Sequence, residues 1–447
     1  MKNINNLKYY FIILVLLVAS CNLDEEVDPN RPTLSSVPVD ATAATLNNLV
    51  AGTLSNMLTN YVTYIDAVGI AGREHYRFSP ADPRFVGDLL TGNLDNNAFY
   101  TTNSYTERYQ VVRNAEILID AATNSPFIAD SAIAGYIGLA QTIQAHELLI
   151  ALNQQGENGI RVDVADFENL GPFVSEDEAL AAISTLLQDG FTNLSNAGEG
   201  FLFTLTASTT SGFIGLNTPE TFGQFNRALA ARVFVYRELW EQAITAVSQS
   251  FQSSNIPLEF GAYYDFEQGA GLLQNQLFIA PNSSGDIRLV HPDFLNDAEA
   301  NDARVERFTQ IRDSPVTNTN LTGTHDITRY SSLNDNIPII TNEELTLILA
   351  EASIQTGDFT TAVSALNEIR QESGGLGEFS GPTDNEAPLI DEMLNQRRYS
   401  LYFLGHRWVD LRRYNRLSTD IPIDRAGDTA YDRFPRPLQE EIADGTN

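Results

Sequence analysis

Pairs of amphipathic helical segments recur along this chain of 447 residues, and they restrict it to a mainly helical fold. Within each segment, apolar residues return every three or four positions, which places them on one face of a helix. Such a face must be covered by a neighbour, so each pair should form a hairpin and the hairpins should stack. The predicted pairs are 105–122 with 133–152, 177–194 with 222–239, and 343–352 with 359–370, and a further helix is predicted over 46–61.

Small side chains indicate the kind of hairpin. Ala140, Ala145, Ala231 and Ala350 stand where two helices would approach closely, and pairs built in this way resemble tetratricopeptide-type hairpins. The pairs are interrupted by residues 196–220 and 255–340, which are rich in glycine, proline and small polar residues. We therefore predict one mainly α domain over residues 41–447, with loop-rich excursions and a few short strands, of which 277–279 and 287–290 are candidates.

The first forty residues have the pattern of an exported, lipid-anchored protein. Two lysines precede the apolar run 9–19, which is too short to span a bilayer but suits a secretory signal peptide. The run ends in Val-Ala-Ser-Cys21, which resembles the lipobox of bacterial lipoproteins, whose cysteine carries acyl chains such as palmitate. We predict a signal peptide over 1–20, lipidation at Cys21 and a flexible tether over 21–40; an ordinary signal peptide with an incidental cysteine is the alternative.

The net charge of the chain limits the classes of macromolecule that it can bind. The chain has 58 acidic and 27 basic residues, and its formal net charge is −31. Lys2 and Lys8 are the only lysines, so every basic residue beyond the signal peptide is an arginine. A surface this acidic repels phosphate backbones, and we expect no nucleic-acid partner.

The stretch 396–414 concentrates arginine in an otherwise acidic chain. It predicts a helix that ends at Gly405, followed by a shorter helix with Trp408 and Leu411 facing inward. Asp410 is its only acidic residue, so we expect its five arginines to dock against carboxylates of the same fold. Those arginines are Arg397, Arg398, Arg407, Arg412 and Arg413.

This stretch also resembles the C-terminal pattern of SusD/RagB-type outer-membrane lipoproteins, Glu-Arg-Arg-x-Glu-Leu-x-Phe-Glu-Gly-x-Arg-x-x-Asp-Leu-x-Arg. Three glutamates of the pattern are replaced here, by Gln396, Ser400 and Leu404. The segment from Ala350 to Arg370 is similar to the corresponding part of such proteins as well. The residues that match the C-terminal pattern are Arg397, Arg398, Leu401, Phe403, Gly405, Arg407, Asp410, Leu411 and Arg413.

The resemblance implies a function outside the cell. A SusD/RagB-like protein is anchored to the outer membrane, captures glycans at the cell surface and delivers them to a SusC-like TonB-dependent transporter, over which it acts as a hinged lid. Asp24-Glu25-Glu26 resembles the acidic signal for surface export in Bacteroidetes, although a solvated linker would have the same composition. The alternatives are a surface lipoprotein glycosidase and a RagB-like protein that captures peptides.

No residue pattern indicates catalysis. The chain has neither a phosphate-binding loop nor a Gly-x-Ser-x-Gly motif, and its five histidines never pair at metal-ligand spacing. Its single cysteine excludes internal disulfides and multi-cysteine metal sites. Asp293, Asp297, Glu299 and Asp302 lack the order of a calcium loop and form only a minor alternative. We expect no enzyme, no cofactor and no bound metal.

A glycan platform needs flat, exposed rings, and we place it on irregular segments. Trp240 and Trp408 stand at positions that indicate burial, so tyrosine and phenylalanine should supply the rings. Residues 66–102 are broken by glycine and proline and rich in arginine, which favours a loop surface for ligands. The alternative is that these rings fill a small core beneath the loops. The predicted ligand-binding residues are Arg73, Tyr76, Arg77 and Phe78 as the main cluster, with Phe99, Tyr100, Tyr263 and Tyr264.

Overall fold

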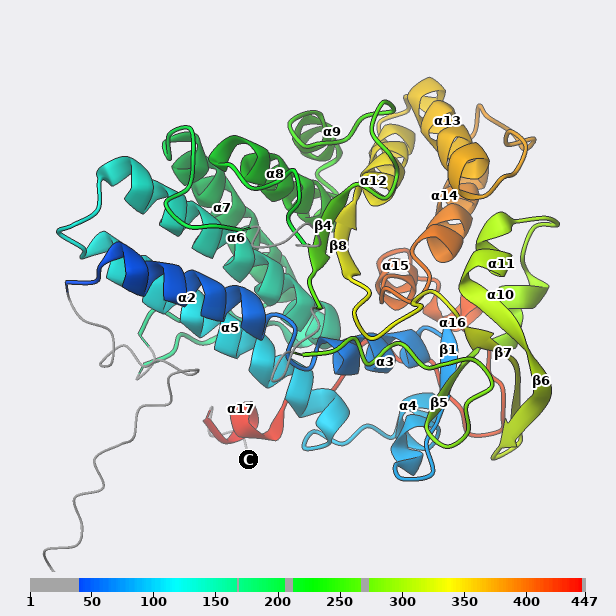
Figure 1. Ribbon diagram of the computed structural model, residues 1–447. Helices are drawn as coiled ribbons and strands as arrows, with labels where there is room; N and C mark the ends of the chain where they lie inside the picture. The colour runs from blue at the N-terminus through cyan, green and yellow to red at the C-terminus, as the bar shows by residue number, and fades with distance from the viewer. Residues whose placement is uncertain (1–39, 167–168, 206–211, 267–272, 444–447) are drawn as a thin grey trace, which may run out of the picture.

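The computed structural model describes residues 40–166, 169–205, 212–266 and 273–443. The predicted signal peptide, Cys21 and the predicted tether up to residue 39 lie outside the described residues. The described chain is mainly helical with a few short strands, which confirms the predicted fold class (Figure 1). Within this part of the chain, no helix combines the length and the apolar character needed to cross a bilayer.

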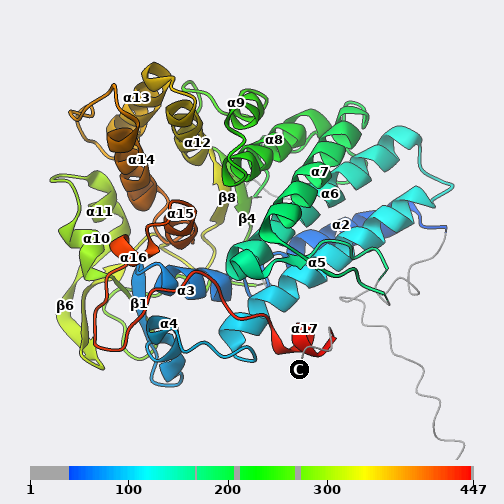
Figure 2. The same ribbon diagram turned by 180° about the vertical axis from the view of Figure 1, so that it is seen from behind.

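One half of the molecule is a layer of helices connected in sequence. α6 packs against both α5 and α7, α7 packs against α8, and α2 lies along α5 (Figures 1 and 2). The predicted hairpins 105–122 with 133–152 and 177–194 with 222–239 are thereby confirmed, with ends shifted by a few residues. The elements are α2 (Ala43–Asn56), α5 (Phe99–Thr123), α6 (Asp130–Gln155), α7 (Glu176–Ser195), α8 (Pro219–Tyr236) and α9 (Trp240–Ser248).

The other half contains the C-terminal helices. α12 joins the halves because it packs on α8 and α9 on one side and on α13 and α14 on the other. α15 lies in the middle of the molecule, with α12 and α14 on one side of it and the stack of α6 to α8 on the other (Figure 2). The elements are α12 (Asn342–Gln355), α13 (Phe359–Glu368) with a π-helical turn (Ile369–Ser373), α14 (Glu386–Ser400), α15 (Arg407–Arg413), α16 (Leu417–Asp420) and α17 (Leu438–Ala443).

Three small antiparallel sheets and several short helices complete the described chain. The largest sheet has the strand order β1-β5-β7-β6, and the others pair β2 with β3 and β4 with β8. The strands are β1 (His75–Phe78), β2 (Ile160–Arg161), β3 (Phe173–Val174), β4 (Gly261–Tyr264), β5 (Ile287–Val290), β6 (Thr309–Asn318), β7 (Leu321–Ile327) and β8 (Ile337–Thr341). The helices are α3 (Tyr61–Ala71), α4 (Asp88–Thr91), α10 (Pro292–Asn296), α11 (Ala303–Phe308) and the 3₁₀ turns η2 (Pro83–Phe85) and η3 (Gly156–Asn158).

Side-chain caps mark the start of several of the paired helices, α7, α12 and α13 among them. Ser175 accepts a hydrogen bond from the backbone N–H of Glu178, and the Glu178 carboxylate accepts one from the N–H of Ser175, which forms a capping box at the start of α7. Thr341 caps α12 and Asp358 caps α13 through single side-chain bonds. Each cap satisfies backbone N–H groups that have no partner inside the helix.

A glycine permits the closest approach between two helices. A Cβ atom on Gly138, in α6, would lie 2.7 Å from Cγ and 2.9 Å from the backbone nitrogen of Leu194, in α7. Gly138 therefore leaves no room for a side chain, and the backbone of α6 packs directly on Leu194 of α7. This contact joins two of the predicted hairpins rather than the two helices of one.

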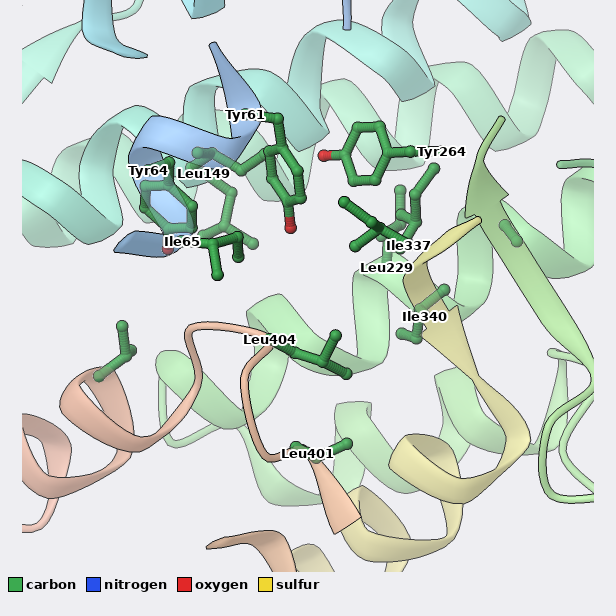
Figure 3. Packing of buried hydrophobic residues seen from close by; sticks show 14 of the residues in the cluster. Tyr61, Tyr64, Ile65, Leu149, Leu229, Tyr264, Ile337, Ile340, Leu401 and Leu404 are labelled. Carbon is green, nitrogen blue, oxygen red and sulfur yellow. The ribbon is translucent and has the colours of Figure 1, made fainter. Parts of the chain in front are cut away.

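The halves meet in a shared core around α3. Tyr61 lies beside Tyr264 of β4, Tyr64 and Ile65 lie in the same cluster near Leu149 of α6, and Leu401 and Leu404 approach from the turn after α14 (Figure 3). The rings of Tyr61 and Tyr264 have centroids only 4.0 Å apart. Segments more than 300 residues apart in sequence thus bury the same apolar surface.

Four sequence-based predictions about local structure were wrong. The first arginine-rich helix ends at Ser400 rather than at Gly405, because Phe403 and Gly405 both take positive φ angles, of 61° and 80°, in a turn that packs on α3. Residues 277–279 form no strand. Much of the supposedly irregular stretch 66–102 is regular, since it contains most of α3, then β1, η2, α4 and the start of α5. Tyr263 and Tyr264 lie on strand β4 rather than in a loop.

Candidate functional site

The main predicted ligand cluster lies in the core. The exposed fractions of Arg73, Tyr76 and Phe78 are 1, 2 and 3%. Tyr76 and Phe78 belong to β1, which pairs with β5, and Arg73 donates hydrogen bonds to the backbone carbonyls of Ile70 and Leu90. In this conformation the two rings offer no face to a sugar, and the residues hold α3, β1 and α4 together.

Arg77 belongs to a buried ion-pair network. Its guanidinium contacts Asp66 at 2.7 Å and Asp286 at 2.6 Å, and Arg288 contacts Asp66 at 2.6 Å from the other side. Burial alone would raise the pKa of Asp66, but Arg288 and Arg77 hold that pKa well below its usual range. His75 also contacts Asp66, at 3.3 Å. The Arg77 guanidinium is therefore engaged by carboxylates of the same fold.

The remaining predicted residues lie on two other elements. Phe99 and Tyr100 are in the first turn of α5, and the Tyr100 hydroxyl donates to Asp88 at 2.8 Å. Tyr264 is buried and bonds to His146 at 2.7 Å, whereas Tyr263 and Phe99 are half-buried. Arg77 lies 4.0 Å above the Phe85 ring, and that ring contacts Phe99, so Phe85 connects the two predicted residues. Tyr263 and Tyr264 lie on β4 and do not belong to this group. Ligand contact by these eight residues stays a prediction.

Partly exposed rings occur instead where the ends of several helices meet. Tyr236 ends α8, Trp240 begins α9, and Tyr414 follows α15. All three are half-buried and line a hollow of about 630 Å³, which we call the tryptophan groove. Its other lining residues are Glu157, Glu176, Asp177, Leu180, Glu238, Gln355, Arg412, Arg413, Asn415, Leu417, Ser418 and Asp432.

The floor of the groove is held by Arg413. Its guanidinium lies 4.6 Å from the centre of the Tyr236 ring and 5.6 Å from that of Tyr414. Arg413 also pairs with the buried Glu351, whose carboxylate accepts a 2.9 Å bond from the Tyr414 hydroxyl. Burial would lower the pKa of Arg413, but Glu351 and Asp410 raise it, so Arg413 keeps its positive charge. Two rings are thereby set rigidly at one surface.

A buried charge cluster lies beneath this floor. Arg397 of α14 donates two hydrogen bonds to Asp410 of α15, at 2.7 and 3.0 Å, and Arg232 of α8 binds Glu344 of α12 through two bonds of 2.7 Å. Arg398 and Arg412 also pair with carboxylates, whereas Arg407 donates to backbone carbonyls. The expectation that the arginine-rich stretch docks on carboxylates of its own fold is confirmed for four of its five arginines.

The groove keeps free hydrogen-bonding groups beside its rings. Within the described chain, no hydrogen bond engages the indole N–H of Trp240 or the side chains of Asn415 and Ser418. The carboxylates of Asp177 and Glu238 are likewise exposed and unpaired among the described residues. Amphipathic rings next to unused donors and acceptors form a surface that suits a polar ligand with flat apolar faces.

Two other hollows differ in character. One, of about 400 Å³, lies near α10, α14, α15 and α16 and is lined mainly by charged residues, without an aromatic ring. The other, of about 1010 Å³, is the glutamate hollow, and its one ring, Phe308, is only 8% exposed and covered by Arg307 and Arg329. Its glutamates are Glu259, Glu343, Glu368, Glu372 and Glu378.

The acids of the minor calcium alternative have other partners. Asp297 pairs with Arg398, Glu299 with Arg370 and Asp302 with Arg304, at 2.7 to 2.8 Å. Among the described residues, no three His, Cys, Asp or Glu side chains converge as a metal site would require. The structure therefore gives this alternative no support.

Sequence reasoning missed Trp240 because it assigned this ring to the buried continuation of α8. The chain instead leaves α8 at Tyr236 and turns at Glu238, which has a φ of 56°. This turn starts α9 with Trp240 at its first position, where the ring is only partly covered. A left-handed glutamate is not a recognisable turn signal, so only Arg237-Glu238 in an otherwise apolar run hinted at the break.

Comparison with known proteins identifies the fold. Residues 303–445 match the model of the SusD family. The surface glycan-binding protein A from Bacteroides uniformis is 14% identical, with a TM-score of 0.69 over 91% of this chain and 99% of that chain. A SusD superfamily protein from Bacteroides thetaiotaomicron is 16% identical, with a TM-score of 0.68 over 91 and 98%.

A third solved structure contains a ligand. Surface glycan-binding protein A from Bacteroides thetaiotaomicron, in complex with laminarihexaose, is 13% identical, with a TM-score of 0.69 over 90% of this chain and 98% of that chain. No curated protein matches the sequence significantly. The family match covers the arginine-rich C-terminal stretch, and the SusD superfamily fold covers nearly all of the chain. Residues 303–445 therefore match the SusD family, and the fold of about nine-tenths of the chain is that of SusD superfamily structures.

Proposed function

We propose that this protein binds glycans at the cell surface, without cleaving them, and that the tryptophan groove is its binding site. The observation that carries the proposal is the groove itself, which sets three half-exposed rings beside unused hydrogen-bonding groups on a SusD scaffold. Sugar rings have apolar faces that stack on aromatic side chains and hydroxyl edges that bond to polar ones. The likeness to a protein solved with laminarihexaose supports this assignment.

The test is substitution of Trp240. Trp240→Ala removes a half-buried stacking ring together with its free indole N–H, whereas Trp240→Phe keeps a ring but loses the indole N–H. We expect Trp240→Ala to weaken glycan binding by at least about tenfold, as loss of an anchoring ring does in other interfaces, and Trp240→Phe to weaken it less. Binding is measured by affinity electrophoresis with soluble polysaccharides, laminarin among them, and melting confirms that the variants are folded.

Phe127 provides the matched control. It is 64% exposed in the link between α5 and α6 and does not line the groove. Phe127→Ala should leave binding unchanged, because it removes an exposed ring elsewhere on the surface. Glycan binding that survives Trp240→Ala in a folded protein contradicts the assignment of the groove. Release of reducing ends from a bound oligosaccharide contradicts the non-enzymatic role.

We also propose that Cys21 anchors the protein to the outer membrane. Acyl chains on that cysteine would supply the membrane affinity, so Cys21→Ala should release the protein into the soluble fraction. Retention of this variant in the membrane at the wild-type level would refute the anchor. The proposal rests on the lipobox-like sequence and on the family.

Delivery to a SusC-like TonB-dependent transporter is the third part of the proposal. A stable complex of this kind buries more than about 2,000 Å² and should survive mild detergent. We expect a large outer-membrane barrel to co-purify with the protein from native membranes. Repeated isolation of the protein alone would argue against a role in transport.

A further inference from the structure

The tryptophan groove has an uneven distribution of charge. Five carboxylates line it, those of Glu157, Glu176, Asp177, Glu238 and Asp432, against two arginines, and it contains no lysine or histidine. The rings therefore lie within a rim that is mainly negative.

The two arginines offset this rim only in part, because Arg412 pairs with Glu176 alone, at 3.6 Å. Arg413 is neutralised from below, because it pairs with Glu351 and contacts Asp410 at 3.4 Å. Arg412 donates to the backbone carbonyls of Asn153 and Asp432, and its side chain is only 13% exposed. Burial lowers the pKa of Arg412, and Glu176 opposes this shift. A ligand in the groove would meet little positive charge.

The carboxylates, in contrast, include exposed and unengaged groups. Asp177 lies in the first turn of α7 and Glu238 in the turn before α9, and neither has an ion pair within the described chain. Glu157 and Asp432 share the single exposed cation Arg433. Burial raises the pKa of Glu176; Arg412 opposes this shift, and the neighbouring acids Glu157, Asp177 and Asp432 add to it.

We propose that the groove selects uncharged or amine-bearing glycans and rejects glycans that carry uronate or sulfate groups. Sugar hydroxyls can donate charge-assisted hydrogen bonds to Asp177 and Glu238, whereas an anionic group there would face like charge at short range. This inference rests on the proposed glycan-binding function and adds the chemical class of the ligand.

The experiment compares uncharged, amine-bearing and anionic polysaccharides on the full chain purified in detergent. The probes are laminarin, xyloglucan and chitosan on one side, and polygalacturonate, alginate and chondroitin sulfate on the other. Affinity electrophoresis is run at low and at high salt, because screening shortens the reach of surface charge. We expect retardation by one or more of the first three probes, and binding of each anionic probe at least about tenfold weaker at low salt.

Charge removal then tests the cause. In the double variant Asp177→Asn with Glu238→Gln, we expect binding of the anionic probes to rise by about tenfold at low salt and by less at high salt. The matched control is Glu372→Gln with Glu378→Gln, which removes the same charge from two exposed residues of the glutamate hollow. This control should change anionic binding by less than about twofold, because it alters only the distant field.

The outcomes separate the two levels of the proposal. An anionic probe that binds the wild type as tightly as the best uncharged probe, and is lost in Trp240→Ala, overturns the charge selection while leaving the groove as the binding site. If anionic binding rises equally in the Asp177/Glu238 double variant and in the Glu372/Glu378 control, the net charge of the protein causes the rejection of anionic glycans. That result also overturns the inference. Failure of every probe to bind, or binding that ignores Trp240→Ala, overturns the proposed function together with the inference.

Discussion

Removal of the Asp410 carboxylate should destabilise the protein strongly. Asp410 accepts two hydrogen bonds from Arg397, at 2.7 and 3.0 Å, and the side chains of the two residues are 5 and 2% exposed. The variant Asp410→Ala would leave the Arg397 guanidinium inside the protein without its partner. It would also take from Arg413 one of its two carboxylate contacts.

The magnitude follows from this burial. Breaking a buried pair by removing one partner costs about 3–5 kcal/mol, since the remaining charge has lost its hydration and gains nothing in return. The Asp391–Arg416 pair is the control, because its 2.6 Å contact joins side chains that are 63 and 30% exposed. Loss of such a surface pair in Asp391→Ala should cost less than about 1 kcal/mol.

Urea unfolding followed by circular dichroism measures both values from the midpoint and slope. A second variant, Arg397→Met with Asp410→Leu, removes both charges and fills the space with apolar atoms. We expect it to be more stable than Asp410→Ala by at least about 1 kcal/mol. The reasoning is refuted if Asp410→Ala unfolds within about 1 kcal/mol of the wild type, or if the double variant is the less stable of the two.

Three further outcomes follow from the core. Burial raises the pKa of Glu74 from 4.5 to about 7, so between these pH values the folded chain keeps a proton that the unfolded chain releases. The free energy of unfolding should therefore fall by about 3 kcal/mol as the pH rises through this interval. Urea unfolding at pH 4 and 8 should show this loss in the wild type and not in Glu74→Gln. Gly138→Ala should lower stability by about 1–3 kcal/mol because its Cβ meets Leu194, whereas Gly52→Ala, on α2 with nothing within 4 Å, should be neutral or stabilising, as thermal melts would show. Phe78→Ala should cost about 3–5 kcal/mol, and a variant as stable as the wild type would place that ring outside the core.

The helical layer could be predicted because its information is local. The stripes of α5 to α8 repeat within a few turns, and the short link between α5 and α6 fixes the pairing of those two helices. The arginine-rich stretch could be interpreted for a related reason, since in an acidic protein its cations had few alternatives to internal carboxylates. Both inferences needed no knowledge of distant contacts.

The candidate site depended on distant contacts, and this is where sequence reasoning failed. Tyr76 and Phe78 look like loop aromatics until β1 pairs with β5, more than 200 residues later in the chain. Trp240 looks buried until α8 ends four residues before it. Exposure of a ring is a property of the assembled fold, and neither periodicity nor composition encodes it.

The path of the last residues has a consequence for how the chain acquires its structure. Residues 425–438 run back over the start of the fold, where the N–H of Thr429 donates to Leu90 and that of Leu438 to Asn96, at 2.9 and 3.0 Å. Phe434, fully buried, packs near Tyr100, and the tail can be followed past α4 to α17 beside α5 (Figure 2). Elements near residue 90 thus complete their packing only with residues more than 300 positions later in the chain. Because the intervening chain must be brought together before these contacts form, we expect this part of the fold to be completed late in folding.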